Sequence, residues 1–244
     1  MNRARGELEV FEDPGAVARA GAERFAAAAE RAIAASGRFA VALAGGSTPR
    51  ATYQILAQAF RDLIAWEKVE IFFGDERCVP PEHPDSNYRM AREALLDRVP
   101  LAADHVHRIA GELPPEEAAR DYQATLERVL GPAPRFDLVL LGMGKDGHTA
   151  SLFPGTSALT EREKKVAAVH VTQLDTWRVT LTAPVLCAAA EVVVMTVGDE
   201  KADALARALD GPDGAVPIQL VRPTSGKMAW LVDRAAAARL RPGM

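Results

Sequence analysis

The sequence predicts an α/β fold in three layers, in which helices cover both faces of a doubly wound, mostly parallel sheet of the Rossmann type. Strand-like and helix-like stretches alternate along all 244 residues, which is the order expected of parallel β/α units. The strand-like run 138–141 is entirely apolar, as suits a strand covered on both faces. No internal repeat or low-complexity linker interrupts the alternation, so we expect a single domain over residues 1–244.

In the first half of the chain, capping residues mark the expected boundaries. Asp13-Pro14 offers an N-cap and a proline at the first helical position, and Gly37 stands where a C-cap glycine belongs. The expected elements are a strand at 8–11, a helix from 14 to the cap at 37, a strand at 39–44, a helix opened by Thr48-Pro49, a strand at 69–73 and a helix at 87–96.

In the second half, hydrophobic periodicity sets the expected elements. Residues 177–182 alternate between apolar and polar side chains, which is typical of a strand with one exposed face. Proline-rich stretches at 78–86 and 111–115 are expected loops. The expected elements are a helix at 116–130, strands at 138–141, 177–182 and 192–197, a helix at 200–209, a strand at 228–232 and a closing segment at 233–240.

Composition and charge exclude several classes of protein. The chain is 48% apolar and 25% charged and holds two cysteines, which excludes a disordered chain, a fibre and a disulfide scaffold. No apolar run approaches the roughly 20 residues of a membrane span. A net charge of −4 argues against a surface that binds nucleic acid or an anionic membrane. The N-terminus lacks the apolar stretch of a signal peptide, so we expect a cytoplasmic protein.

Polar, glycine-containing clusters follow four of the strand candidates immediately. In open α/β sheets, ligands bind outside the carboxyl ends of the strands, so a parallel sheet would bring these clusters to one edge. Their convergence indicates a binding site more strongly than any one cluster does. The four clusters are 45–48, 74–77, 142–148 and 198–201.

The first cluster, Gly45-Gly46-Ser47-Thr48, predicts a phosphate site. It joins a strand to a helix N-terminus, where backbone N–H groups, the helix dipole and the hydroxyls favour an anion. A tight turn with a helix cap is the alternative. Because no Gly-Lys-Ser/Thr follows, the loop does not indicate ATP hydrolysis.

Four charged side chains are further candidates for the binding site at this edge of the sheet. Arg178 lies on the polar face of its strand and suits bidentate binding of phosphate or carboxylate, although a surface position would explain it equally well. Lys201 lies in the first turn of its expected helix, where a cation opposes the dipole unless a bound phosphate compensates. Asp75 and Arg77 end another strand, with a surface ion pair as the alternative.

The cluster 142–148 matches the Gly-x-Gly-x-x-Gly of dinucleotide-binding loops, but no second strand ending in an acidic residue follows about 20 residues later. We therefore expect no dinucleotide there. The loop carries Asp146 and His148 instead, a carboxylate near an imidazole, which suits a general base; a histidine that caps the loop backbone is the alternative. His105-x-His107 lacks a third metal ligand, so we expect both imidazoles at the surface.

With these residues in view, the chain resembles the 6-phosphogluconolactonase family nearly from end to end. The most specific stretches are 44–50, 73–88 and 142–155, and the stretches 177–182 and 230–234 also match. Lys145 stands at a position that the family leaves variable. No departure falls at a position that we would expect to be catalytic.

The resemblance implies a fold of the deaminase/lactonase type and hydrolysis of 6-phospho-D-glucono-1,5-lactone to 6-phosphogluconate in the pentose phosphate pathway, without a metal or cofactor. His148 would act as the general base, oriented by Asp146. Arg77 and Asp75 would position the sugar and stabilise charge. The expected partner is this small lactone, with no nucleic acid and no membrane, and the chain would be a monomer or a homodimer. The residues expected to bind the phosphate are Gly45, Gly46, Ser47, Thr48, Arg178 and Lys201.

The sequence leaves two alternative functions open. Glucosamine-6-phosphate deaminases share the general fold, but their corresponding loop has a glutamate just before Pro-Gly, where this chain has Phe153. Sugar-phosphate-sensing domains of bacterial regulators share it too, but normally carry a helix-turn-helix and a basic patch. Ammonium release from glucosamine 6-phosphate would indicate the deaminase, and binding of 6-phosphogluconate without lactone turnover would indicate the sensor.

Overall fold

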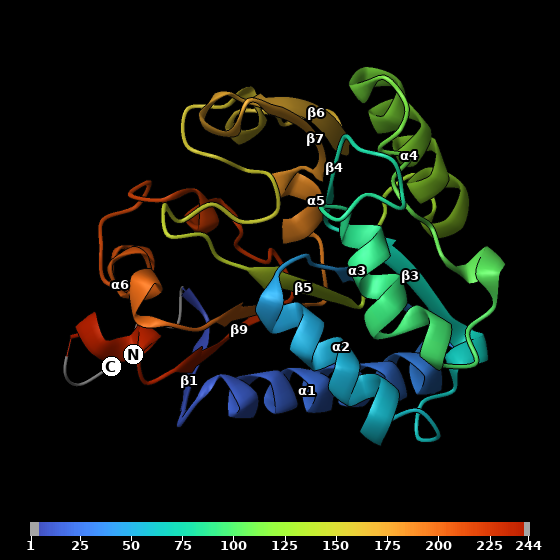
Figure 1. The fold of residues 1–244 in the computed structure, drawn as a ribbon, viewed down its shortest axis with the longest axis horizontal. Coiled ribbons are helices and arrows are strands. Elements are labelled where there is room, and N and C mark those ends of the chain that lie inside the picture. The colour runs from blue at the N-terminus through green and yellow to red at the C-terminus, as the bar shows by residue number, and fades with distance from the viewer. Residues whose placement is uncertain (1–4, 242–244) are drawn as a thin grey trace.

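The computed structural model describes residues 5–241 and contains two β-sheets (Figure 1). The larger sheet has six strands in the order β1-β9-β8-β5-β2-β3, and every neighbouring pair is parallel. The prediction of an α/β fold around a mostly parallel sheet is therefore confirmed. The strands of this sheet are β1 (Glu7–Phe11), β2 (Phe39–Leu43), β3 (Val69–Phe73), β5 (Leu138–Gly142), β8 (Glu191–Thr196) and β9 (Lys227–Asp233).

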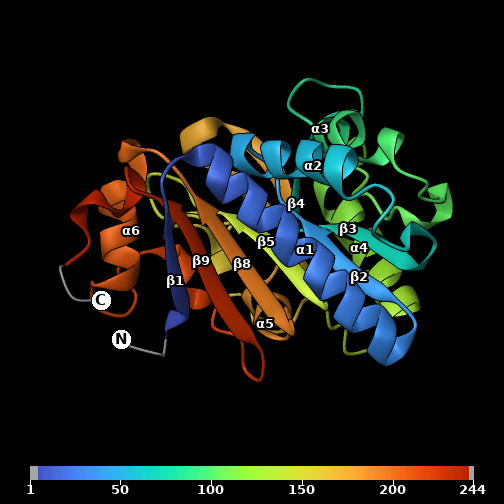
Figure 2. The same cartoon turned by 90° about the horizontal axis from the view of Figure 1, so that it is seen from below.

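Helices flank the six-stranded sheet. The longest helix, α1, crosses one face of the sheet and packs beside α2, whereas α5 lies beyond the other face (Figure 2). The predicted caps of α1 are present: the Asp13 carboxylate accepts a hydrogen bond from Ala16 N at 2.9 Å, and Gly37 is left-handed with φ 79°. The helices are α1 (Pro14–Ser36), α2 (Ser47–Ala59), α3 (Asn87–Ala94), α4 (Pro115–Leu130), α5 (Ala183–Cys187) and α6 (Ala202–Leu209).

A second, antiparallel sheet contains β4 (Asp75–Arg77), β7 (Thr176–Leu181) and β6 (Val166–Val171). Here the structure corrects the sequence interpretation, which missed β6 and placed 75–77 at the end of the preceding strand. The chain changes sheets at Gly74. Its N–H donates to Leu43 O of β2 at 2.8 Å, and its carbonyl accepts from Leu181 N of β7 at 2.9 Å. Gly74 therefore joins the two sheets, and 75–77 forms the strand of the antiparallel sheet that follows it directly.

One further expectation near the C-terminus is corrected. Lys201 ends a short 3-10 turn, Asp199–Lys201, and α6 begins one residue later, so Lys201 precedes the α-helix. The closing segment forms only the 3-10 turn Ala236–Arg239. The other 3-10 turns are Trp66–Lys68, Leu96–Arg98, Ala103–His105, Ser157–Leu159, Thr172–Leu174 and Pro217–Leu220.

The expectation that His107 lies at the surface is wrong. Its side chain is buried, with Nε2 at 2.7 Å from Glu70 Oε2 and its ring stacked on Phe72 at a centroid separation of 4.5 Å. The cause is an added backbone contact: His107 N donates to Ile71 O at 2.8 Å, which lays this segment along β3. Sequence spacing alone did not reveal that contact.

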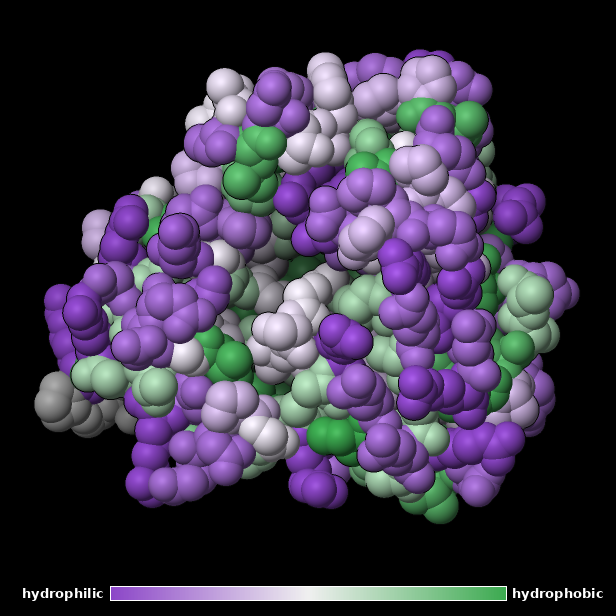
Figure 3. All heavy atoms as spheres, viewed as in Figure 1, coloured by the Kyte–Doolittle hydropathy of each residue, from purple (hydrophilic) through white to green (hydrophobic). Residues whose placement is uncertain are grey.

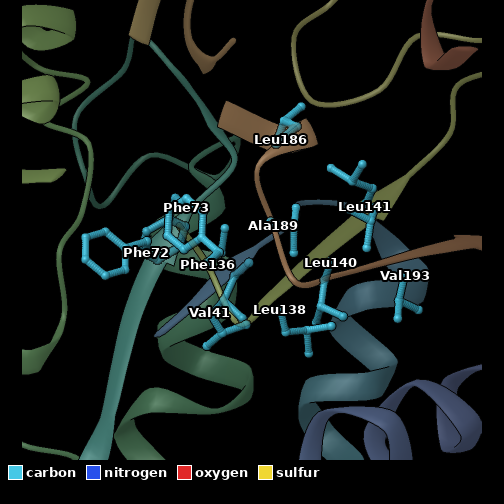
Figure 4. Packing of buried hydrophobic residues seen from close by; sticks show 14 of the residues in the cluster. Val41, Phe72, Phe73, Phe136, Leu138, Leu140, Leu141, Leu186, Ala189 and Val193 are labelled. Carbon is cyan, nitrogen blue, oxygen red and sulfur yellow. The ribbon is translucent and has the colours of Figure 1, made fainter. Parts of the chain in front are cut away.

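The hydrophobic core lies around the central strands. Side chains of β2, β3, β5 and β8 meet there with Phe136 and with Leu186 of α5 (Figure 4). The strands β2, β5 and β8 are fully buried or nearly so along their lengths, and each large apolar side chain contributes about 1.5–3 kcal/mol on burial. A rigid sheet therefore supports the loops at its carboxyl edge.

Within residues 5–241, no helix combines the length and apolar character needed to cross a bilayer.

Candidate active site

A pocket of about 300 Å³ opens at the carboxyl edge of the six-stranded sheet. Figure 3 shows a hollow near the middle of this face of the molecule, with hydrophilic residues along its upper rim. All four polar clusters contribute to the lining, so the predicted convergence is confirmed. From these clusters the lining includes Gly45, Gly46, Ser47, Thr48, Gly74, Asp75, Arg77, Gly142, Gly144, His148, Glu200 and Lys201, and Arg178 joins them from β7.

The N-terminus of α2 forms one wall of the pocket. The N-cap residue Gly46 has φ 104°, which favours glycine, and no side chain caps the helix. The first turn carries no acidic residue, so its N–H groups and positive dipole end are free for an anion. Gly45 lets the Asn87 side chain pack closely against this loop, because a Cβ at position 45 would lie 1.9 Å from Asn87 Oδ1.

His148 and Asp146 form a tight pair at the end of the loop after β5. His148 Nδ1 lies 2.6 Å from Asp146 Oδ1, which also accepts a hydrogen bond from His148 N at 3.1 Å. Partial burial acts to raise the pKa of Asp146, but the hydrogen bonds and charge of His148 outweigh it and lower the pKa. Because Nδ1 is engaged, Nε2 is the ring nitrogen left for chemistry in the pocket.

Gly144 makes room for this pair. A Cβ at that position would lie 2.1 Å from His148 Nδ1 and 2.7 Å from Asp146 Oδ1. Gly144 N also donates to His148 O at 2.8 Å, which closes the loop on itself. The middle glycine of the pattern that matches dinucleotide-binding loops thus serves here to fit an imidazole against the backbone.

Asp75 is buried beneath Arg178 at the junction of the two sheets. Its Oδ2 accepts a hydrogen bond from Ser151 Oγ at 2.6 Å and lies 3.7 Å from Arg178 Nη1. Its Oδ1 accepts from Asn87 Nδ2 at 3.2 Å. Both oxygens are therefore occupied by the protein itself, although the residue lines the pocket.

Arg178 is a pocket residue and its side chain is only 11% exposed. Burial lowers the pKa of its guanidinium, and the charge of Asp75 acts in the opposite direction. Within the described residues, its Nε has no hydrogen-bond partner. The alternative of a plain surface residue therefore does not hold for Arg178.

Glu76 organises the loop that carries Arg77. Its buried carboxylate accepts hydrogen bonds from Arg77 N at 2.8 Å, Asn87 N at 2.7 Å and Tyr88 N at 2.8 Å, and from Ser86 Oγ at 3.0 Å. Burial raises the pKa of Glu76 despite these bonds. It faces away from the pocket, as its alternation with Asp75 and Arg77 in the strand predicts. Arg77 itself donates from Nη1 to Asp85 O.

Sequence reasoning missed two side chains around the site, Asn87 and Ser151, both of which hold Asp75. Each lies in a segment that the family resemblance covers, but only the fold shows that they meet. Lys201 lines the pocket from the turn before α6. Among residues 5–241, no three His, Cys, Asp or Glu side chains gather as a metal-binding group.

The chain is similar in sequence to known proteins over most of its length. The family description "Glucosamine-6-phosphate isomerases/6-phosphogluconolactonase" matches residues 12–230. A 6-phosphogluconolactonase from Nostoc is 40% identical over 218 residues, covering 86% of this chain and 88% of that protein. The rat 6-phosphogluconolactonase is 40% identical over 216 residues, covering 84% and 81%.

Solved structures show the same likeness in three dimensions. The 6-phosphogluconolactonase from Trypanosoma brucei is 32% identical with a TM-score of 0.87, over 97% of this chain and 99% of that one. A monomeric glucosamine-6-phosphate deaminase reaches a TM-score of 0.82 over 96% and 99% of the two chains, at 17% identity. The latter shows a shared fold only.

Proposed function

The chain belongs to the family of glucosamine-6-phosphate isomerases and 6-phosphogluconolactonases, and from this premise we infer how its pocket works. It hydrolyses 6-phospho-D-glucono-1,5-lactone to 6-phospho-D-gluconate, a step of the pentose phosphate pathway. The observation that carries the mechanism is the 2.6 Å pair of His148 and Asp146 in a pocket whose other wall is the uncapped N-terminus of α2.

His148 is the general base of this mechanism. Its Nε2 takes a proton from a water molecule, and the resulting hydroxide attacks the lactone carbonyl carbon to form a tetrahedral oxyanion. Asp146 holds the proton on Nδ1 and stabilises the imidazolium that forms. As the C–O bond to the ring oxygen breaks, the imidazolium returns its proton to that oxygen, and the new carboxylic acid loses its own proton to solvent.

Cationic side chains stabilise the charge that develops on the carbonyl oxygen. Arg77 and Arg178 both line the pocket, and fixed cations in a partly desolvated site favour an oxyanion more than water does. Asp75 orients Arg178 through their 3.7 Å contact. Because both of its oxygens already accept hydrogen bonds, we assign Asp75 to positioning rather than to direct contact with sugar hydroxyls.

The substrate phosphate binds at the N-terminus of α2. Gly45, Gly46, Ser47 and Thr48 offer backbone N–H groups and two hydroxyls there, which is a favourable environment for a phosphate. Lys201 supplies a positive charge from the facing turn. This anchor lies apart from the base and fixes the lactone carbonyl in reach of it.

Nothing in the pocket favours the deaminase over the lactonase. At the position where the deaminases have a carboxylate, this chain places the Phe153 ring against His148, with 3.9 Å between ring centroids. A sensing function leaves the ordered His148–Asp146 pair without a purpose. The cytoplasmic location and the monomeric or dimeric state remain predictions.

The test is lactone hydrolysis with substrate generated in the cuvette, measured above the spontaneous opening of the lactone. Wild type should accelerate the reaction, and His148→Ala should lose about 10²–10⁴-fold in kcat with little change in KM. An unchanged kcat in this variant would remove His148 from the mechanism. No acceleration by folded wild-type protein would refute the lactonase, and ammonium release from glucosamine 6-phosphate would then identify the deaminase.

A further inference from the structure

Phe153 contacts two of the charged or ionisable groups of the pocket without lining the pocket itself. Its side chain is buried, at 4% exposure. Its ring is stacked against the His148 imidazole, with 3.9 Å between centroids and 19° between planes. The guanidinium carbon of Arg178 lies 5.3 Å from the centre of the same ring. One aromatic ring therefore supports both the base and a cation of the site.

A strained and well-anchored turn holds Phe153 in this place. Leu152 N donates to Thr149 O at 2.9 Å, and within the turn Ala150 has φ 46°, a left-handed conformation that is unfavourable for alanine. Ser151 is bound on both sides, by its hydroxyl to Asp75 Oδ2 and by its N–H to Thr180 Oγ1 at 3.2 Å. The turn thus delivers the ring from the same network that fixes Asp75.

The other contacts of His148 and Arg178 leave the orientation of each side chain only partly fixed. The bond to Asp146 fixes His148 at Nδ1 only, and a flat ring stacked on the imidazole adds control of its plane. That plane decides where Nε2 points. Arg178 has a carboxylate contact only at 3.7 Å and an unpartnered Nε among the described residues. The negative face of an aromatic ring gives such a buried cation a second support.

We propose that Phe153 is a positioning residue that sets the plane of the His148 imidazole and holds the Arg178 guanidinium, and so couples the base to the anion-binding side of the pocket. The proposal rests on the lactonase function inferred above. It requires a flat aromatic ring at this position, because an aliphatic side chain fills the volume but offers neither a stacking plane nor a quadrupole. An aromatic substitute should therefore restore what an aliphatic one loses.

Three variants test this requirement. Phe153→Leu removes the ring and should lower kcat and raise KM together, with kcat/KM down about 10- to 100-fold. Phe153→Tyr keeps the ring and should stay within about threefold of wild type in both constants. Phe136→Leu makes the same chemical change at an equally buried core position, and should lose a similar amount of unfolding stability with kcat and KM unchanged.

Titration with the product, 6-phosphogluconate, measures the contribution of Arg178 to ligand affinity separately from turnover. Phe153→Leu should bind it more weakly, by about 3- to 30-fold, and Phe153→Tyr should bind it as wild type does. The proposal is overturned if Phe153→Leu keeps both kinetic constants, or if Phe153→Tyr and Phe153→Leu lose activity equally while Tyr remains as stable as wild type. It is also overturned if Phe136→Leu reproduces the kinetic loss.

A failure of the lactonase function would give a different result from a failure of this proposal. If wild-type protein does not accelerate lactone opening, the function is wrong, and crystal structures of the two Phe153 variants then decide the positioning. The imidazole plane of His148 should turn away from its wild-type orientation in Phe153→Leu and keep that orientation in Phe153→Tyr. An unchanged imidazole plane in Phe153→Leu would refute the proposal in that case.

Discussion

Gly144→Ala is a substitution whose effect on catalysis follows directly from the geometry of the loop. The residue does not have a positive φ, so alanine can adopt its backbone conformation. Its methyl carbon would nevertheless stand 2.1 Å from His148 Nδ1, where an ordinary contact begins at 3.4 Å. The loop cannot simply open, because Gly144 is hydrogen-bonded to both His148 O and Gly147 N. The imidazole must therefore move by about 1.3 Å.

A displacement of this size has a calculable effect on rate. Misplacing a reacting group by about 1 Å reduces the rate roughly 100-fold, which corresponds to about 2.7 kcal/mol of transition-state stabilisation. We expect kcat of Gly144→Ala to fall by about 100-fold. KM should stay within a few-fold of wild type, because the phosphate anchor at α2 is untouched.

The assay is lactone hydrolysis at saturating substrate, with the spontaneous rate subtracted. Gly142→Ala is the matched control, because its added methyl would meet only Met195 O, at 4.0 Å, and its kcat should remain close to wild type. A Gly144→Ala variant that folds and retains wild-type kcat would refute the assignment of His148 as the base in this geometry. An equal loss of kcat in Gly142→Ala would show that the loop does not tolerate any methyl group.

The remaining predictions concern the anchor, the loop and pH. Lys201→Ala should raise KM about 10- to 100-fold with kcat nearly constant, since one charge-assisted contact to phosphate is lost; a loss confined to kcat would contradict this role. Glu76→Ala leaves three backbone N–H groups unpaired and should lower the free energy of unfolding in urea by roughly 3 kcal/mol or more, so a loss below about 1 kcal/mol would refute it. The lowered pKa of Asp146 means that its contribution to stability is present at neutral pH and disappears as the pH falls through the folded pKa, below the ordinary 3.8. Wild type should therefore exceed Asp146→Asn in unfolding stability at pH 7, and the difference should shrink steadily as the pH falls below 3.8.

Local sequence patterns predicted most of the larger sheet correctly. Asp13, Pro14 and Gly37 act through contacts within a few residues, so their capping roles could be read from the chain. The second sheet could not be predicted in this way. Its pairing of β4 with β7 joins residues about a hundred positions apart, such as Asp75 and Thr180, and no local pattern encodes such a partner.

Part of the candidate site could likewise be predicted from local sequence, and part could not. The glycines, the hydroxyls and the pair of Asp146 and His148 are recognisable in the sequence, because each belongs to one loop that follows one strand. Their convergence also follows from the sequence, since parallel strands place their carboxyl ends on one edge. The sequence did not reveal that Ser151 and Asn87 occupy Asp75, nor that one ring supports His148 and Arg178.

The sequence by itself determined the class of fold, the edge of the sheet that carries the site and the chemical groups available there. These depend on hydrophobic period, capping and loop composition, which act over a few residues. Only the tertiary structure decided which charges are buried, as with Arg178 and Glu76, and which side chains contact the candidate catalytic residues. Burial and side-chain contact depend on segments that meet only when the chain is folded, and packing at close range has no local signature.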